Sequence, residues 1–286
     1  MSCEVNSLGN NSNNRAKKQA DPYSDDQSSV IRELEISLTN VCNLDCQGCG
    51  FSVPKQVQPF DSRGVMHHLD SLMLLRGAGV SIKRIVLVGG EAALVAGLDQ
   101  FISDLRRLNV CQEIELVTNG LYPRGINADV LQGLDRFVVS DYVYDDEFEE
   151  LWLHYLKLSG FKGESYFRRK DFWDDLMGDR SNDPVVVEQH WKTCFYRSYD
   201  VTLERGRIFS CSRIAKKLQD DQGLLLTDHL KADDVRSYLM SVKPKESCYS
   251  CPTVGASSNI PVAVQLDSDI DKILVKAKKY LRLQVL

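Results

Sequence analysis

The sequence predicts an α/β fold whose parallel sheet closes only part of a barrel. Short runs rich in Ile, Val, Leu and Phe alternate with helical patterns from about residue 31 to about residue 190. Repeated strand–helix units indicate a parallel sheet with right-handed crossovers. The chain holds roughly five or six such units, fewer than the eight that close a (β/α)8 barrel. We therefore expect an open, partial (β/α)6 barrel.

The expected elements follow one another along the chain. The strands are short and apolar, which is typical of strands buried on both faces. They span Leu34–Thr39, Arg84–Val88, Glu113–Thr118, Arg136–Ser140 and Glu164–Arg168. Helices with apolar residues at helical spacing are expected over Met66–Arg76, Leu98–Leu108 and Asp146–Leu158. The last of these begins with acidic residues, which stabilise a helix N-terminus.

The pattern changes after about residue 190. Tyr199–Glu204 and Arg207–Cys211 flank an Arg-Gly pair, which predicts a hairpin. Apolar residues at helical spacing over Asp269–Leu283 predict a final helix. We divide the chain into a disordered polar tail (1–30), the partial barrel (31–190), a small cysteine-rich domain (191–265) and a docking helix (266–286).

Composition excludes several classes of protein. The net charge of −5 and the lack of a basic stripe argue against a nucleic-acid binder. No apolar run approaches the ~20 residues of a membrane span, and the N-terminus lacks an apolar signal core. We therefore expect a cytoplasmic protein without membrane partners. In that compartment, nine cysteines are expected to bind metal rather than to form disulfides.

Three of these cysteines follow the first expected strand with the spacing Cys42-x3-Cys46-x2-Cys49. Three thiolates on one short loop can hold three irons of a cubane cluster and leave the fourth iron open for chemistry. A structural zinc site or free buried thiols are the alternatives, although structural zinc usually takes four protein ligands.

Glycine-containing turns follow the next two strands, at Val88-Gly-Gly-Glu91 and Val117-Thr-Asn-Gly120. The carboxyl ends of parallel strands share one rim, where ligands bind in such folds. Gly89 and Gly90 would let a ligand approach the backbone, and Glu91 would offer a carboxylate to an ammonium group. An ordinary strand-to-helix turn is the alternative.

This ordered set of motifs resembles the radical S-adenosylmethionine (radical SAM) superfamily over roughly residues 31–190. The resemblance implies a [4Fe–4S] cluster on Cys42, Cys46 and Cys49, whose open iron is chelated by S-adenosylmethionine. It also implies contacts to that cofactor from a set of rim residues. These are Gly89, Gly90, Glu91, Asn119, Ser140 and Asp141.

The chain departs from the superfamily pattern at two positions. The residue before the third cysteine is usually aromatic and lies near the adenine, but here it is Gly48. We therefore expect the adenine to pack elsewhere, against a residue such as Phe51. Ala92 replaces the proline that usually follows Gly-Gly-Glu. Neither departure removes an iron ligand, so an active enzyme is expected.

Four later cysteines form a second set: Cys194, Cys211, Cys248 and Cys251. Their spacing alone fits a zinc ribbon as well as an iron–sulfur site. Because they follow a radical SAM-like barrel, they resemble the twitch module, the shortened form of the SPASM extension. The resemblance implies an auxiliary [4Fe–4S] cluster that four thiolates saturate. Such a cluster is suited to accepting an electron.

The combination is similar to the 2-deoxy-scyllo-inosamine dehydrogenases of aminoglycoside biosynthesis. It implies an oxidoreductase in which a 5′-deoxyadenosyl radical removes hydrogen from a hydroxyl-bearing carbon of a small sugar or aminocyclitol. A flavodoxin or ferredoxin type of donor would supply electrons. The catalytic proton acceptor is not identified. The cations Arg168, Arg169 and Lys170 are expected to form a solvated surface run, with a contribution of the segment Phe167–Lys170 to the substrate pocket as the alternative.

Three alternatives stay open. The first is a radical SAM epimerase of an aminoglycoside or peptide, which would need a free thiol. Outside the two cysteine sets stand Cys3, in the tail, and Cys111, which is expected to be a packed core thiol. The second is modification of a ribosomal peptide, and the third is a non-catalytic zinc-binding interaction protein.

Overall fold

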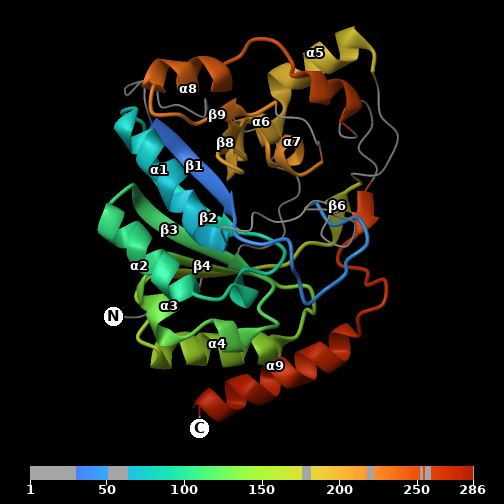
Figure 1. Cartoon of the computed structure of the whole chain (residues 1–286). Coiled ribbons are helices and arrows are strands. Elements are labelled where there is room, and N and C mark those ends of the chain that lie inside the picture. Colours follow the sequence, from blue (N-terminus) through green and yellow to red (C-terminus); the bar gives the residue numbers. More distant parts are fainter. Residues whose placement is uncertain are drawn as a thin grey trace.

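A computed structural model describes residues 30–50, 64–175, 182–217, 222–251, 254 and 259–285. An eight-stranded sheet with the order β5-β4-β3-β2-β1-β7-β8-β9 forms its centre (Figure 1). The six strands from β5 to β7 in that order are parallel; β8 is antiparallel to β7, and β9 is antiparallel to β8. The predicted α/β fold with an open parallel sheet is confirmed. The predicted tail up to residue 29, and Phe51, lie outside the described residues.

The strands of this sheet lie close to the predicted positions. They are β1 (Val30–Ser37), β2 (Ser81–Val88), β3 (Cys111–Thr118), β4 (Arg136–Ser140), β5 (Glu164–Arg168), β7 (Thr202–Glu204), β8 (Arg207–Phe209) and β9 (Leu224–Leu225). The bounds of β4 and β5 agree with the prediction, while β1, β2 and β3 begin two to four residues earlier. The first residues of these strands include polar ones. They pair with the neighbouring strands although no apolar pattern in the sequence predicts that they do.

Helices α1–α4 lie between the strands of the parallel sheet and cover one of its faces (Figure 1). The helices of the described residues are α1 (His67–Gly77), α2 (Leu98–Leu108), α3 (Ala128–Gln132), α4 (Asp146–Leu158), α5 (Pro184–Thr193), α6 (Phe195–Tyr199), α7 (Ser212–Lys217), α8 (Ala232–Leu239) and α9 (Ile270–Val285). Both α2 and α4 have the predicted bounds. The start of α4 is set by its N-cap, Asp145, whose side chain accepts the N–H of Phe148 at 2.8 Å.

The helix-covered face of the sheet is apolar. Strand register places alternate residues of neighbouring strands in rows, and the rows on this face belong to one buried core. Its sheet members are Leu34, Ile36, Ile85, Leu87, Ile114, Leu116, Phe137 and Val139. Phe148 and Trp152 of α4 are fully buried against it. The core fixes the directions of the strands, and therefore the rim at which their carboxyl ends meet.

The opposite face carries paired charges beside the buried Val86, Val88 and Val138, so the expectation of apolar burial on both faces holds only in part for this side. Arg84 lies 2.6 Å from Glu33 and 3.6 Å from Glu115. Glu115 is also paired with Arg136 at 3.6 Å and with Arg168 at 2.9 Å. Half-buried charges are tolerated here because each lies beside opposite charge on the next strand. The Arg168 side chain is 46% exposed, so it stays in contact with solvent, as expected, while it makes this salt bridge.

The predicted hairpin is β7–β8, whose turn residues Arg205 and Gly206 both have positive φ. This geometry is typical of a type I′ turn. Because β7 pairs with β1, the strands of the predicted second domain continue the main sheet, and the domain boundaries stay a prediction. Figure 1 shows α5–α8 gathered at one end of the molecule, with α9 packed along α4 at the other.

Two short strands were not expected from the sequence. Strand β6 (Phe172–Asp174) pairs with β10 (Asn259–Pro261) in a separate two-stranded sheet. The predicted C-terminal helix is confirmed as α9, which begins at Ile270 rather than Asp269 and ends at Val285. Among the helices of the described residues, none has the length and apolar character that a membrane crossing requires.

Candidate functional site

The first cysteine loop begins at the carboxyl end of β1 and lies against the turn after β2. Gly90 N–H donates to the carbonyl of Thr39 at 2.7 Å, and Glu91 N–H donates to the carbonyl of Val41 at 2.8 Å. A Cβ atom at Gly90 would lie 2.3 Å from the Val41 carbonyl oxygen. Glycine is thus required for backbone-to-backbone packing, which holds the loop beside the Gly-Gly-Glu turn.

Glu91 links this loop to the end of β3. Its side chain is 1% exposed, and its carboxylate accepts three hydrogen bonds. The donors are Ala93 N–H at 2.9 Å, the Thr118 hydroxyl at 2.6 Å and Asn119 N–H at 2.7 Å. Burial raises the pKa of Glu91, and these donors oppose that rise. The carboxylate that was expected to meet an ammonium group is therefore already held by protein donors.

Asn119 brings the Thr-Asn-Gly turn to the first cysteine. Its side-chain Nδ2 donates to Asn43 Oδ1 at 2.7 Å and lies 3.8 Å from Cys42 Sγ. The N–H of Leu44 donates to the same sulfur at 3.4 Å. The structure thus brings the cysteine loop, the Gly-Gly-Glu turn and the Thr-Asn-Gly turn together at one rim, as predicted.

The turn after β4 is held by its own contacts. Asp141 is fully buried; its Oδ1 accepts the N–H groups of Val143 and Tyr144, both at 3.0 Å. Its Oδ2 accepts Arg169 Nε at 2.7 Å. Arg169 also pairs with two acidic residues of α4, so this cation orders the turn rather than facing solvent alone.

Tyr142 of that turn is a site residue that the sequence analysis did not single out. Burial raises the pKa of Tyr142, a hydrogen bond to the Ser140 side chain opposes the rise, and the thiols of the first cysteine loop add to it. The phenol is therefore an electrostatic neighbour of those thiols. Its ring meets Trp173 of β6 edge-to-face at a centroid distance of 5.6 Å. The pair places aromatic surface near the loop.

The three thiols of the first loop influence one another. Burial raises the pKa of Cys42 to about 12, and the neighbouring Cys46 and Cys49 contribute to the rise. Burial likewise raises the pKa of Cys46 to about 11. Such thiols are protonated at neutral pH, so a metal that binds them must displace protons.

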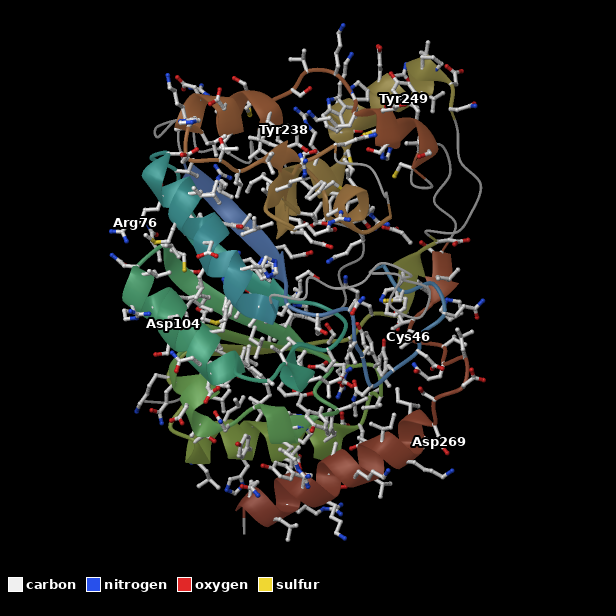
Figure 2. All side chains as sticks on the ribbon, in the orientation of Figure 1. Cys46, Arg76, Asp104, Tyr238, Tyr249 and Asp269 are labelled. Atoms are coloured by element: carbon white, nitrogen blue, oxygen red, sulfur yellow. The ribbon has the colours of Figure 1, made fainter. Side chains whose placement is uncertain are left out.

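The four later cysteines also approach one another. Burial raises the pKa of Cys248 to about 11, with further contributions from Cys251 and Cys194. Burial raises the pKa of Cys211 well above its usual range, and Cys194 contributes again. Cys194, between α5 and α6, is thus an electrostatic neighbour of the other three. In the view of Figure 2, Cys46 lies apart from Tyr238 and Tyr249, which mark the region of this second group.

The two cysteine sets offer thiol sulfurs, which are the protein donors that hold iron–sulfur clusters. Within the described ranges no three His, Cys, Asp or Glu side chains lie close enough to hold one metal ion. In a cubane each thiolate binds a different iron, so its sulfurs stand further apart than around a single zinc ion. All eight cysteines of the described residues are free of disulfides. Cys111, which belongs to neither cysteine group, packs against the core as predicted.

Comparison with known proteins identifies partial similarities. No protein-family model matches the chain. The GTP 3′,8-cyclase of Alkaliphilus oremlandii is 30% identical over 125 residues, which are 42% of this chain and 38% of that enzyme. The GTP 3′,8-cyclase of Helicobacter pylori is 34% identical over 113 residues, 39% of this chain and 35% of that enzyme. The chain thus spans less than two fifths of these curated relatives.

Two solved structures are similar at low identity. BtrN in complex with AdoMet and 2-DOIA is 13% identical with a TM-score of 0.44, covering 82% of this chain and 95% of BtrN. The anSMEcpe structure with bound AdoMet and Cp18Cys peptide is 13% identical with a TM-score of 0.41, covering 90% and 96%. The similarity to enzymes named GTP 3′,8-cyclase agrees with the resemblance to the radical SAM superfamily that the ordered set of motifs carries.

Proposed function

We propose that the chain is a radical SAM oxidoreductase with two [4Fe–4S] clusters. It would oxidise a hydroxyl-bearing carbon of a small sugar or aminocyclitol by two electrons. The observation that supports this most is the rim at which the Cys42 loop, the Gly-Gly-Glu turn and the Thr-Asn-Gly turn are held together. The similarity to the cyclases supports the radical SAM part of this proposal. The two-electron oxidation is a more specific proposal.

Cys42, Cys46 and Cys49 would hold the first cluster, and Cys194, Cys211, Cys248 and Cys251 the second. When bound, the first cluster and S-adenosylmethionine would supply a 5′-deoxyadenosyl radical, and the second cluster would accept one electron from the substrate. Asn119 and Leu44 N–H direct donors toward the Cys42 sulfur. Such donors orient a thiolate ligand and stabilise its charge.

S-adenosylmethionine would lie beside Gly89, Gly90, Glu91, Asn119, Ser140 and Asp141. The protein contacts of Glu91 and Asp141 support roles for these two carboxylates in shaping the rim. Contact with the cofactor would then fall to the glycine backbone, Asn119 and Ser140. The aromatic pair Tyr142 and Trp173 is a candidate wall for the adenine, in place of the side chain that Gly48 lacks.

The second cysteine group supports oxidation over epimerisation. Epimerisation would need a free thiol, whereas Cys248 and Cys251 both lie within electrostatic reach of Cys194. Cations also lie in this region: Arg213 acts on Cys194 and Cys211, and Lys245 acts on Cys248. Positive charge beside four thiolates would stabilise a reduced cluster.

A nucleotide cyclase is the second candidate. The similarity to enzymes named GTP 3′,8-cyclase favours it, and a purine nucleotide would then replace the sugar. The two candidates share the first cysteine group and differ in product. A cyclisation leaves the substrate without net two-electron oxidation.

Anaerobic turnover tests the proposal. Reconstituted protein is given S-adenosylmethionine, dithionite and either 2-deoxy-scyllo-inosamine or GTP as probe. We expect 5′-deoxyadenosine together with a ketone from the aminocyclitol. The C42A/C46A/C49A variant should make neither product, while Cys111→Ala, which removes a thiol outside both groups, should retain activity.

Each other result has a distinct meaning. A cyclised product from GTP would replace the oxidoreductase with the cyclase. Deuterium incorporated from solvent into the aminocyclitol without oxidation would favour an epimerase. Zinc in place of iron, without 5′-deoxyadenosine, would contradict the radical SAM proposal altogether.

A further inference from the structure

The segment that precedes α9 lies against the first cysteine loop, although more than two hundred residues separate the two in sequence. Gln265 forms an antiparallel bridge with Cys46. On either side of this bridge, Gln47 N–H donates to the Val264 carbonyl at 2.7 Å, and Leu266 N–H donates to the Asp45 carbonyl at 3.4 Å. In Figure 2, Cys46 lies on the same side of the molecule as Asp269, where this segment leads into α9.

The side chain of Gln265 points at the Cys46 sulfur. Its Nε2 lies 3.1 Å from Cys46 Sγ and 2.6 Å from the Ala263 carbonyl oxygen. Its Oε1 accepts the N–H of Asp45 at 3.1 Å. A backbone N–H can only donate, so the amide oxygen must face Asp45 and the amide nitrogen must face the sulfur. The hydrogen-bond network therefore fixes which end of the carboxamide meets Cys46.

Gln265 is the nearest side-chain donor that the described residues direct at the first cysteine group. Asn119 Nδ2 stands further away, 3.8 Å from Cys42 Sγ. Leu44 also donates to Cys42, but through a backbone N–H that only a proline substitution would remove. Cys46 is only 8% exposed, and a hydrogen bond to a charged sulfur is stronger where water is excluded.

A donor at a cluster thiolate acts on the electron affinity of the cluster. The sulfur becomes more negative when an electron is added, so an N–H directed at it stabilises the reduced form more than the oxidised form. The reduction potential rises as a result. Because the donor comes from the segment before α9, this effect requires that segment to be seated on the loop.

We infer that Gln265 is a positioning residue that raises the reduction potential of the cluster on Cys42, Cys46 and Cys49 through its amide hydrogen bond to Cys46. The inference rests on the proposed function, because it requires a cluster at those thiolates. It adds a C-terminal residue to a site otherwise built from strand ends of the parallel sheet.

The test is an EPR-monitored redox titration of reconstituted full-length protein without substrate. In Gln265→Leu the donor is lost, and we expect the reduction equilibrium to shift about tenfold toward the oxidised form, or about 59 mV for one electron. Gln265→Glu keeps an acceptor for Asp45 N–H but replaces the donor with negative charge, so a larger shift in the same direction is expected. Gln132→Glu is the matched control, since Gln132 bonds the distant Ser159 carbonyl.

Iron content and thermal unfolding are measured first for every variant. If Gln265→Leu loses iron, Gln265→Glu provides the test, because it retains the contact to Asp45. Full iron content with the wild-type potential in the Gln265 variants would overturn the inference and leave the proposed function standing. Wild-type protein that assembles no cluster at all would instead overturn the proposed function.

Discussion

The carboxylate of Glu91 joins residues from two neighbouring turns while it is almost entirely buried. A buried charge is costly unless hydrogen bonds compensate for lost water, and Glu91 has three donors that do so. One donor is the N–H of Asn119, whose side chain in turn bonds Asn43 in the cysteine loop. Hydrogen bonds within the chain thus tie the Gly-Gly-Glu turn, the Thr-Asn-Gly turn and the cysteine loop to one another.

Glu91→Ala should therefore destabilise the metal-free chain. Three buried donors lose their partner, and we expect the free energy of unfolding to fall by about 2–3 kcal/mol. Chemical denaturation of the apo protein measures this change. Glu150→Ala, an exposed glutamate of α4, is the control and should change little. Equal stability of Glu91→Ala and wild type would show that the carboxylate serves a ligand alone.

Glu35, on the charged face of β1, is a half-buried residue whose carboxylate has one buried oxygen. Its Oε1 is buried and has no hydrogen-bond partner among the described residues. Burial raises the pKa of Glu35 to about 8, and Asp200, Glu204 and Glu33 add to the rise while Lys216 opposes it. The folded state thus holds a proton that the unfolded state releases near pH 4.5.

Glu35 should make the protein less stable as pH rises. Between the unfolded pKa of 4.5 and the folded pKa of about 8, the folded state binds more protons, so the free energy of unfolding falls with increasing pH. Glu35→Gln cannot ionise, so it removes this fall in the free energy of unfolding. We expect the stability of Glu35→Gln relative to wild type to rise between pH 5 and pH 8, by up to about 1.4 kcal/mol for each pH unit. A relative stability that does not rise over this range would contradict this account, with Glu150→Gln as the control.

At the scale of elements, β10 closes the space beside the third cysteine. Gly48 has a φ of 69°, and a Cβ atom there would lie 2.1 Å from Ile260 Cδ1 of β10. The glycine that departs from the superfamily pattern is thus matched by an apolar side chain from another part of the chain. Pairing of β10 with β6 holds Ile260 in place.

Gly48→Ala should combine backbone strain with a steric clash. Left-handed φ costs roughly 1–2 kcal/mol for alanine, and displacing the end of the Ile260 side chain from its rotamer adds about 0.5–1.5 kcal/mol. Gly160→Ala isolates the first effect, because Gly160 has a φ of 71° and nothing within 4 Å of a Cβ atom. Thermal unfolding of both variants, and of G48A/I260A, measures the difference. A Gly48→Ala cost no larger than that of Gly160→Ala would contradict the predicted clash.

Helices and strands with an apolar pattern of their own could be predicted from the sequence. The bounds of α2, α4, β4 and β5 follow from apolar spacing and capping residues within each segment. Strands β6 and β10 span three residues each and pair across more than eighty residues, so neither has a pattern of its own. The contact between Gln265 and Cys46 is equally non-local, and it was not predicted for the same reason.

For the whole molecule, one sheet connects the two cysteine groups. The first group follows β1, and the second surrounds the hairpin β7–β8, which joins the sheet through the parallel pair β1–β7. The positions of Cys42, Cys46 and Cys49 on one loop could be predicted because their spacing is local. The engagement of Glu91 by Thr118 and Asn119, and of Asp141 by Arg169, depends on how strand ends meet and could not.

The most direct test of the central claim is the EPR spectrum of the reduced, reconstituted protein with and without S-adenosylmethionine. The account predicts that the cofactor changes the wild-type spectrum, because three thiolates leave one iron of the first cluster open. The C42A/C46A/C49A variant should retain a cluster signal from the second group that does not respond to the cofactor. A wild-type spectrum that S-adenosylmethionine leaves unchanged would contradict the account.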